Sequence, residues 1–256
     1  MASTKYLSFN PSVADAVNLD ECITEERPAD APMPLQHRWH VWEQIQREAA
    51  AADRAADYSQ NTRDLASFDT VQTFWQLWAH IPQPSELLGH KRMIRQDSSG
   101  KSHVVDALMI FKEGIQPMWE DPQNCVGGHL EYRIVPFQTR AGQLDEYWNN
   151  LVLGLIGGTI EHGSHVTGIR LVDKLGQGRH PCIRIEVWVG KCDRTVQEKL
   201  AKDLEKCFAT KLVRLAAAAQ QQQQQQWVHN LHTLRLLTDG SIGTAPRGDW
   251  KSHSTR

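Results

Sequence analysis

The sequence predicts an α+β fold, in which a mainly antiparallel β-sheet is covered by helices on its apolar face. Three observations support this class. Several segments alternate apolar and polar residues with the period of a strand, and others repeat apolar residues with the period of a helix. The link at residues 175–181 is short and rich in glycine, as an antiparallel hairpin requires. The opposite face of such a sheet is left free for a ligand.

The strand segments are those with alternating side chains, and residues 182–190 are the most informative. One set of their side chains is apolar, whereas the alternate set contains Arg184, Glu186 and Trp188. The apolar set is Ile183, Ile185, Val187 and Val189. The other strand candidates begin at His37 or cover residues 103–111, 127–135 and 165–174.

Three helices are predicted from apolar residues at helical spacing. The first starts at Asp69, whose side chain can cap the helix, and stops before Pro82, with Trp75 beside its stripe and open to solvent. The second covers residues 141–156 and ends at a Gly-Gly pair, and the third begins at Asp193. The three stripes are Val71, Phe74, Trp78 and Ile81; Leu144, Trp148, Leu151 and Leu155; and Val196, Leu200, Leu204 and Phe208.

Nine tryptophans raise the question of whether some form a binding surface. Four lie on periodic apolar segments and are interpreted as core residues, namely Trp39, Trp42, Trp78 and Trp148. Trp119 differs, because it lies in the polar stretch GIQPMWEDP. A large ring exposed in such a turn indicates a binding role.

Composition limits the classes of partner. The 28 basic and 30 acidic residues give a net charge of -2, so the chain has no general attraction for a polyanion, and any nucleic acid must be held locally. The five cysteines lack CxxC spacing and indicate neither a zinc ribbon nor a disulfide framework. No apolar run reaches the roughly 20 residues that a membrane span needs, and the cytoplasm is the expected compartment.

We expect a flexible arm at residues 1–33 and a single domain over residues 34–256. The domain contains an Ala/Gln-rich insertion at about residues 216–226, and the chain after it is expected to be a mobile tail. Residues 46–58 are rich in alanine, so helix propensity favours a short helix there, with a loop as the alternative.

Five sequence blocks resemble, in order and in spacing, the signature blocks of the eukaryotic translation initiation factor 4E family of messenger-RNA cap-binding proteins. They are PLQHRW (34–39), SFDTVQTFW (67–75), FKEGIQPMWED (111–121), YWNNLVLGLIGG (147–158) and IRIEVWVG (183–190). The resemblance covers residues 34–208, and its PMWED block is the most specific. It implies a curved sheet of about eight strands, three long helices on the convex face and a cap-binding slot on the concave face.

The resemblance implies that N7-methylguanine is stacked between two aromatic rings. Methylation gives the purine a positive charge, which adds a cation–π contribution, so that stacking is worth about 1 to 3 kcal/mol per ring. Trp119 matches one stacking ring, and Tyr58 falls where the family has a second tryptophan. Glu120 matches the carboxylate that accepts two hydrogen bonds from the guanine edge, and Trp188 matches the ring that touches the N7 methyl group.

Cations are also needed for the cap triphosphate. Arg184 shares a strand face with Trp188 and matches a phosphate contact of the family, and Lys174 and Arg179 flank the preceding hairpin. His129 stands where the family often has arginine, and a neutral imidazole there would weaken phosphate attraction.

A second surface is implied on the convex side, where an amphipathic helix of a protein partner docks. The matching positions are Pro34, Leu35, Val71, Trp75 and Leu153. Asn149 and Asn150 stand where the family has leucine and glutamate, which leaves a different mode of partner binding open. The expected partners are capped messenger RNA and either a scaffold of the 4G type or a 4E-binding repressor.

The favoured function is cap binding with recruitment of an initiation scaffold, and the alternatives are a cap-binding repressor or storage factor and an interaction module without cap binding. An enzyme is the rival class, because His162 and His165 could pair on a metal. No third ligand has a characteristic spacing, however, and no catalytic motif is present. We therefore expect a monomeric, non-enzymatic protein without cofactor or metal, in the cytoplasm, with the nucleus left open as a second compartment.

Overall fold

A computed structural model describes residues 31–46, 61–88, 91–96, 101–136, 139, 141–176, 180–210 and 246–253. Two predicted site residues, Tyr58 and Arg179, lie outside the described residues. The arm up to residue 30, most of the alanine-rich piece and the Ala/Gln insertion also lie outside them. Among the described helices, none is long and apolar enough to cross a membrane.

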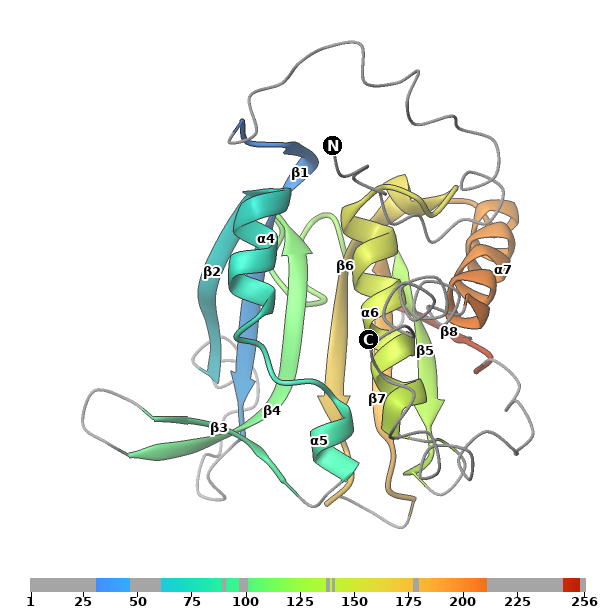
Figure 1. The fold of residues 1–256 in the computed structure, drawn as a ribbon. Helices are drawn as coiled ribbons and strands as arrows, with labels where there is room; N and C mark the ends of the chain where they lie inside the picture. Colours follow the sequence, from blue (N-terminus) through green and yellow to red (C-terminus); the bar gives the residue numbers. More distant parts are fainter. Residues whose placement is uncertain are drawn as a thin grey trace, which may run out of the picture.

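The described strands form one antiparallel sheet (Figure 1). Their order is β2-β1-β4-β6-β7-β5-β8, with β3 paired to β4. The bounds are β1 (Pro34–Ile45), β2 (Thr62–Thr70), β3 (Met93–Gln96), β4 (Ser102–Lys112), β5 (Gly128–Ile134), β6 (Val166–Asp173), β7 (Ile183–Val189) and β8 (Asp249–Ser252). The predicted α+β class is therefore confirmed.

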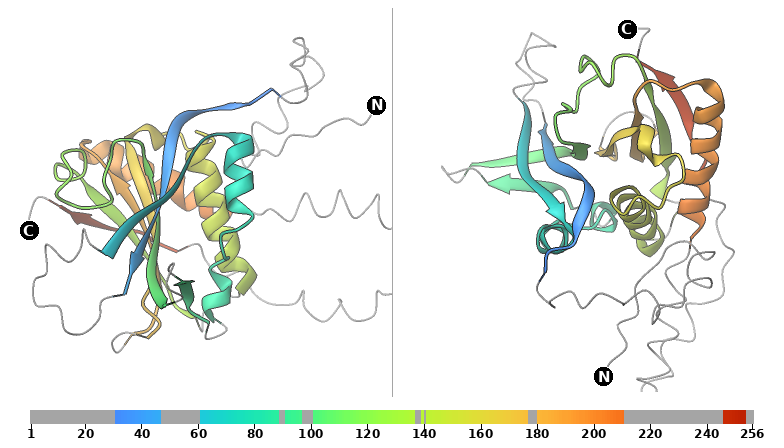
Figure 2. Two further views of the ribbon diagram at one scale, coloured as in Figure 1. Left: turned by 90° about the vertical axis from the view of Figure 1, so that its left-hand side faces the viewer. Right: turned by 90° about the horizontal axis from the view of Figure 1, so that it is seen from above.

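The helices lie on one side of this sheet, as Figure 2 shows for α4 and α6. Their bounds are α4 (Val71–Trp78), α5 (Ser85–Leu88), α6 (Ala141–Ile156), η2 (Gly163–His165) and α7 (Arg194–Ala209). The prediction is confirmed for α6 and for α7, whose N-cap Asp193 accepts a hydrogen bond from the Val196 N–H at 2.8 Å.

The first helix is shorter than predicted, and its predicted cap is wrong. Asp69 still belongs to β2, where its carboxylate pairs with Arg38 of β1 at 2.5 Å. Thr70 caps α4 instead, because its hydroxyl accepts from the Thr73 N–H while the Thr73 hydroxyl accepts from the Thr70 N–H. The helix ends at Trp78, so among the described helices behind the sheet α6 and α7 are long, whereas α4 and α5 are short.

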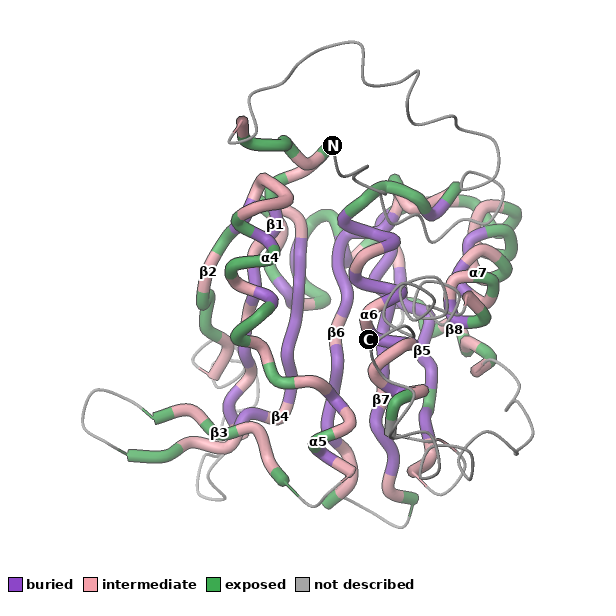
Figure 3. The backbone as a smooth tube through the Cα atoms, in the orientation of Figure 1, coloured by how far each residue is buried: buried purple, intermediate pink, exposed green. Residues whose placement is uncertain are grey.

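The main apolar core lies between the sheet and the helices, where Trp39, Trp78 and Trp148 are buried as predicted. Figure 3 shows that the buried residues concentrate in the central strands and on the inner side of α6. Trp42 is half-buried and packs against a second apolar cluster on the opposite face of the sheet, not against the main core. Alternation along β1 gives the reason, since Trp39 and Val41 take the core side.

The prediction of a mobile tail is wrong for residues 246–253. Four of these residues form β8, which pairs antiparallel with β5 at the edge of the sheet. Trp250 of β8 packs against the main core. Four residues are too few for an alternating pattern to stand out, and the pairing partner lies more than a hundred residues earlier in the chain.

Candidate functional site

Two exposed side chains on the free side of the sheet lie in the loop between β4 and β5, residues 113–127. Figure 2 (left) shows this loop on the side of the sheet opposite α4 and α6. Trp119 is 40% exposed, and the adjacent Glu120 is exposed as well. The next carboxylate, Asp121, is buried, so the two acidic side chains point apart.

Two buried polar side chains hold this loop in shape. The Asp121 carboxylate accepts the backbone N–H groups of Gln116 and Gln123, both at 2.8 Å. The Asn124 amide donates to two carbonyl oxygens of the loop at 2.9 Å, and its Oδ1 accepts from the Thr167 hydroxyl of β6 at 2.8 Å. Because buried polar groups are costly to leave unpaired, these bonds fix the loop to the sheet.

Trp188 of β7 lies on the same face but is buried, with 5% of its surface exposed. Its indole N–H donates to the Glu186 carboxylate at 3.0 Å. The ring is stacked with His129 at a centroid distance of 5.8 Å and meets Phe111 edge-on at 5.5 Å. The Phe111 ring packs directly over Gly168. A Cβ atom at Gly168 would lie 2.4 Å from the phenyl ring, so the glycine makes this packing possible.

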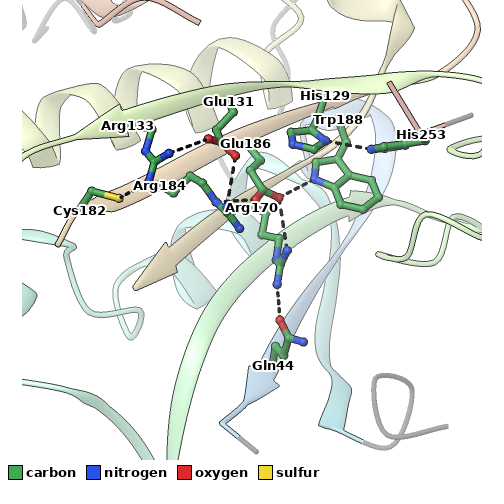
Figure 4. A network of polar contacts seen from close by, with 10 residues as sticks. All are labelled: Gln44, His129, Glu131, Arg133, Arg170, Cys182, Arg184, Glu186, Trp188 and His253. Atoms are coloured by element: carbon green, nitrogen blue, oxygen red, sulfur yellow. Dashed lines mark hydrogen bonds and ion pairs between the residues drawn. The ribbon is translucent and has the colours of Figure 1, made fainter. Parts of the chain in front are cut away.

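A network of ion pairs extends from Trp188 across the face (Figure 4). The Glu186 carboxylate lies 2.8 Å from Arg184 and 3.4 Å from Arg170. Arg184 also pairs with Glu131 of β5 at 3.2 Å, and Arg170 donates to the side chain of Gln44 on β1. These contacts join β1, β5, β6 and β7 on the free face of the sheet.

The surroundings determine the charge states of these groups. Burial alone would raise the pKa of Glu186, but Arg170 and Arg184 outweigh it and hold this pKa below its ordinary value. Burial lowers the pKa of His129 to about 4, so this imidazole is neutral at pH 7, as expected from the sequence. Burial and the charge of Arg184 also lower the pKa of Lys174.

The structure brings together part of the predicted set. Trp188 and Arg184 lie on one face of β7, and Lys174 directly follows the neighbouring β6, but Arg184 is already bound to two carboxylates, which offsets much of its charge. Arg170, Glu131 and the buried His253 belong to the same face but were not predicted from the sequence. The alternation along β6 could have placed Arg170 beside Val172 on this face, but its partners depend on strand order.

The predicted partner surface lies on the helix side. Trp75 is 46% exposed on α4, and Pro34 is exposed at the start of β1. Val71, Leu35 and Leu153 are half-buried.

The two asparagines of α6 are engaged within the fold. Asn149 accepts from the Trp78 indole N–H at 3.1 Å and donates to Gln83 at 2.8 Å, which ties α6 to α4. Asn150 is completely buried and donates to the carbonyl oxygens of Cys207 and Thr210 at the end of α7. The assignment of Asn150 to the partner surface is therefore wrong, because its side chain closes a helix C-terminus.

Among the described residues, two clusters have the geometry to hold a metal ion. One consists of His129, Glu131 and Glu186, but its carboxylates are bound to arginines. The other contains His162, which lies 2.6 Å from Asp203 of α7 and next to Glu161. Neither is the His162–His165 pair considered from the sequence.

Comparison with known proteins identifies the family. The family model described as eukaryotic initiation factor 4E matches residues 34–234. The chain belongs to this family. Its members are translation initiation factors and not enzymes, which agrees with the sequence analysis.

The individual relatives are moderately similar. Initiation factor 4E of Aplysia californica is 35% identical over 164 residues, which cover 60% of this chain and 66% of that protein. The human factor is 31% identical over 160 residues, which cover 62% of each chain. The matched part thus spans somewhat less than two thirds of either relative.

Solved structures show the same fold. The initiation factor 4E-3 of Ascaris suum, solved with an m2,2,7G cap, gives a TM-score of 0.52 at 28% identity and covers 71% of this chain and 87% of that chain. The same Ascaris protein solved with an m7G cap gives 0.51. The Caenorhabditis elegans factor 4E-3, solved with the 4E-binding protein Mextli, gives 0.51 at 24% identity and supports the fold alone.

Proposed function

We propose that this chain binds the N7-methylguanosine cap of messenger RNA on the free face of its sheet. The observation that carries the proposal is the exposed pair Trp119–Glu120 on a loop fixed by buried hydrogen bonds. An exposed ring can stack on the charged base, and a carboxylate beside it can accept both donors of the guanine edge. The cap-bound Ascaris structures provide independent support.

Recognition of the base needs a second ring, and we assign it to Tyr58. Trp188 is the proposed contact for the N7 methyl group, and its orientation is fixed by Glu186 and His129. Arg184 and Lys174 are the proposed phosphate contacts, with Arg179 as a third. Because Glu131 and Glu186 offset much of the charge of Arg184, stacking rather than phosphate attraction should supply most of the selectivity.

A titration with N7-methyl-GTP and with GTP, followed by tryptophan fluorescence, tests the proposal. We expect quenching by the methylated nucleotide at concentrations at which GTP has little effect. Trp119→Ala and Glu120→Ala should each abolish the response, and their thermal unfolding should be unchanged because both side chains are exposed. Equal affinity for the two nucleotides would contradict cap binding.

On the convex side, we propose that α4 recruits a translation initiation scaffold through Trp75. The support is an aromatic ring left 46% exposed on a helix that otherwise packs on the sheet. The alternative is a cap-binding repressor or storage factor that does not recruit the scaffold. Capture on cap resin from a cell extract distinguishes them, because a large scaffold protein should be retained with the wild-type chain under the first hypothesis.

A further inference from the structure

The C-terminal segment, described over residues 246–253, lies beside the candidate site, which was not predicted from the sequence. β8 pairs with β5, and the next residue, His253, is buried on the same face as Trp188. The backbone N–H of His253 donates to the Gly127 carbonyl at 3.0 Å. The segment therefore reaches the end of the loop that carries Trp119 and Glu120.

Glycines make room for this segment at two points. A Cβ atom at Gly128 would lie 2.3 Å from the Lys251 carbonyl oxygen and 2.6 Å from the Trp250 ring. A Cβ atom at Gly248 would lie 2.7 Å from the Tyr132 ring. A larger residue at Gly128 or Gly248 would push β8 away from β5. The close fit of the C-terminal segment therefore depends on a glycine in each of the two paired chain regions.

The imidazole of His253 joins two parts of the site. Its Nδ1 lies 2.8 Å from the carbonyl oxygen of Asn124, and its Nε2 lies 2.9 Å from Nδ1 of His129 (Figure 4 shows the second contact). The ring also contacts Trp188 directly, with centroids 4.6 Å apart. Asn124 fixes the Trp119 loop, so His253 connects that loop with Trp188.

One proton position follows from these contacts. A carbonyl oxygen can only accept, so Nδ1 of His253 carries a proton and donates to Asn124. The second contact joins Nε2 of His253 to Nδ1 of His129, and His129 in turn is stacked on Trp188.

We propose that His253 is a positioning residue of the cap site, which holds the Trp119–Glu120 loop and Trp188 in their relative orientation. This inference rests on the proposed function for its effect on binding, but its effect on Trp188 can be measured without ligand. His253 lies beside the assigned methyl contact. Its loss should therefore reduce the preference for the methylated base and not merely weaken all binding.

The test compares three variants of the full chain. His253→Ala removes both imidazole contacts, His253→Asn keeps a donor near Asn124 but loses the contact with His129, and His80→Ala removes an exposed histidine as the control. The measurements are the affinity ratio of N7-methyl-GTP to GTP and the Trp188 indole N–H resonance in the free protein, assigned by its absence in Trp188→Phe.

We expect His253→Ala to shift the Trp188 resonance and to lower the affinity ratio about tenfold, the loss of roughly one well-made buried hydrogen bond. His253→Asn should lower the ratio about threefold, and His80→Ala should change neither quantity. An unshifted resonance or an unchanged ratio in His253→Ala, even with reduced thermal stability, would overturn the proposal. If the wild-type chain does not prefer the methylated nucleotide, the proposed function fails, and the resonance alone decides whether His253 positions Trp188.

Discussion

The two faces of β7 show two ways of burying side chains. Ile185 and Val187 are fully buried on the helix side, where they belong to the main apolar core. On the opposite side of the same strand, Glu186 is equally buried, but it is surrounded by two arginines and an indole N–H. Apolar burial depends on volume and tolerates imprecise partners, whereas the buried carboxylate needs its complete set of partners.

We expect the largest loss of stability from a substitution that creates a cavity in the core on the helix side of the sheet. Trp148 of α6 is completely buried and lies 6.3 Å from Trp78 between ring centroids. We expect Trp148→Ala to lower the free energy of unfolding by about 3–5 kcal/mol, because it removes a large apolar side chain and leaves a cavity. Urea denaturation measures this value, and a loss below about 1 kcal/mol would show that the core can collapse around the site.

On the opposite face, the corresponding test is removal of the central carboxylate. Glu186→Ala leaves Arg170 and Arg184 near one another without their shared partner, and we expect a loss of about 2–4 kcal/mol. Glu186→Gln retains an acceptor for the Trp188 indole and should cost about half as much.

A surface pair supplies the control for Glu186. Glu198 pairs with Arg194 on the exposed side of α7, so Glu198→Ala should cost less than about 0.5 kcal/mol. If Glu186→Ala and Glu198→Ala have equal effects in urea denaturation, the network does not depend on its complete set of partners.

The stability that the free face of the sheet contributes should also depend on pH. Burial lowers the pKa of His129 to about 4 despite the opposing effect of Glu186, with Arg170, Arg184 and His253 acting in the same direction as burial. In the unfolded chain this pKa is near 6.5, so the neutral histidine contributes fully to stability above pH 6.5. That contribution is lost as the pH falls to about 4, because only the unfolded state gains a proton in this window.

The expected loss from His129 is roughly 3 kcal/mol over the window. His129→Asn should show a shallower decline in unfolding free energy between pH 6.5 and 4 than the wild type. Parallel declines for the two proteins would mean that the imidazole is accessible to solvent protons in the folded state.

The contrast between the faces also explains what could be predicted from the sequence. The helix side follows local periodicity, so α6 was predicted with its observed bounds and the start of α7 was predicted at Asp193, which is its N-cap. The start of α4 was missed, because the choice of Thr70 over Asp69 depends on the distant Arg38.

The free face depends on contacts between distant strands. Arg170 and Gln44 are 126 residues apart, and His253 and Asn124 are 129 apart. Alternation shows which side chains share a face, but the partners of each follow from strand order, which no local pattern encodes. Resemblance located Trp119, Glu120 and Trp188, but it could not reveal the neighbours that hold them.

A small effect on stability, and the clearest separation of the two faces, should come from Trp75→Ala. Its ring is 46% exposed and contacts Phe74 at a centroid distance of 5.0 Å, so we expect a loss of no more than about 1 kcal/mol. Binding of N7-methyl-GTP should be unchanged, because Trp75 lies on the helix side of the sheet. The variant should therefore be retained on cap resin but should bring down no scaffold protein.

Gln76→Ala is the matched control for Trp75, since it changes an exposed neighbour on the same helix. It should retain both the cap and the partner. Loss of cap binding in Trp75→Ala would show that the ring supports the fold. Trp75 and Trp119 lie on opposite sides of the sheet, so removal of a surface ring should not disturb Trp119 directly. Undiminished capture of the scaffold would instead remove α4 from the partner surface and leave the cap site as the chain's sole assigned interface.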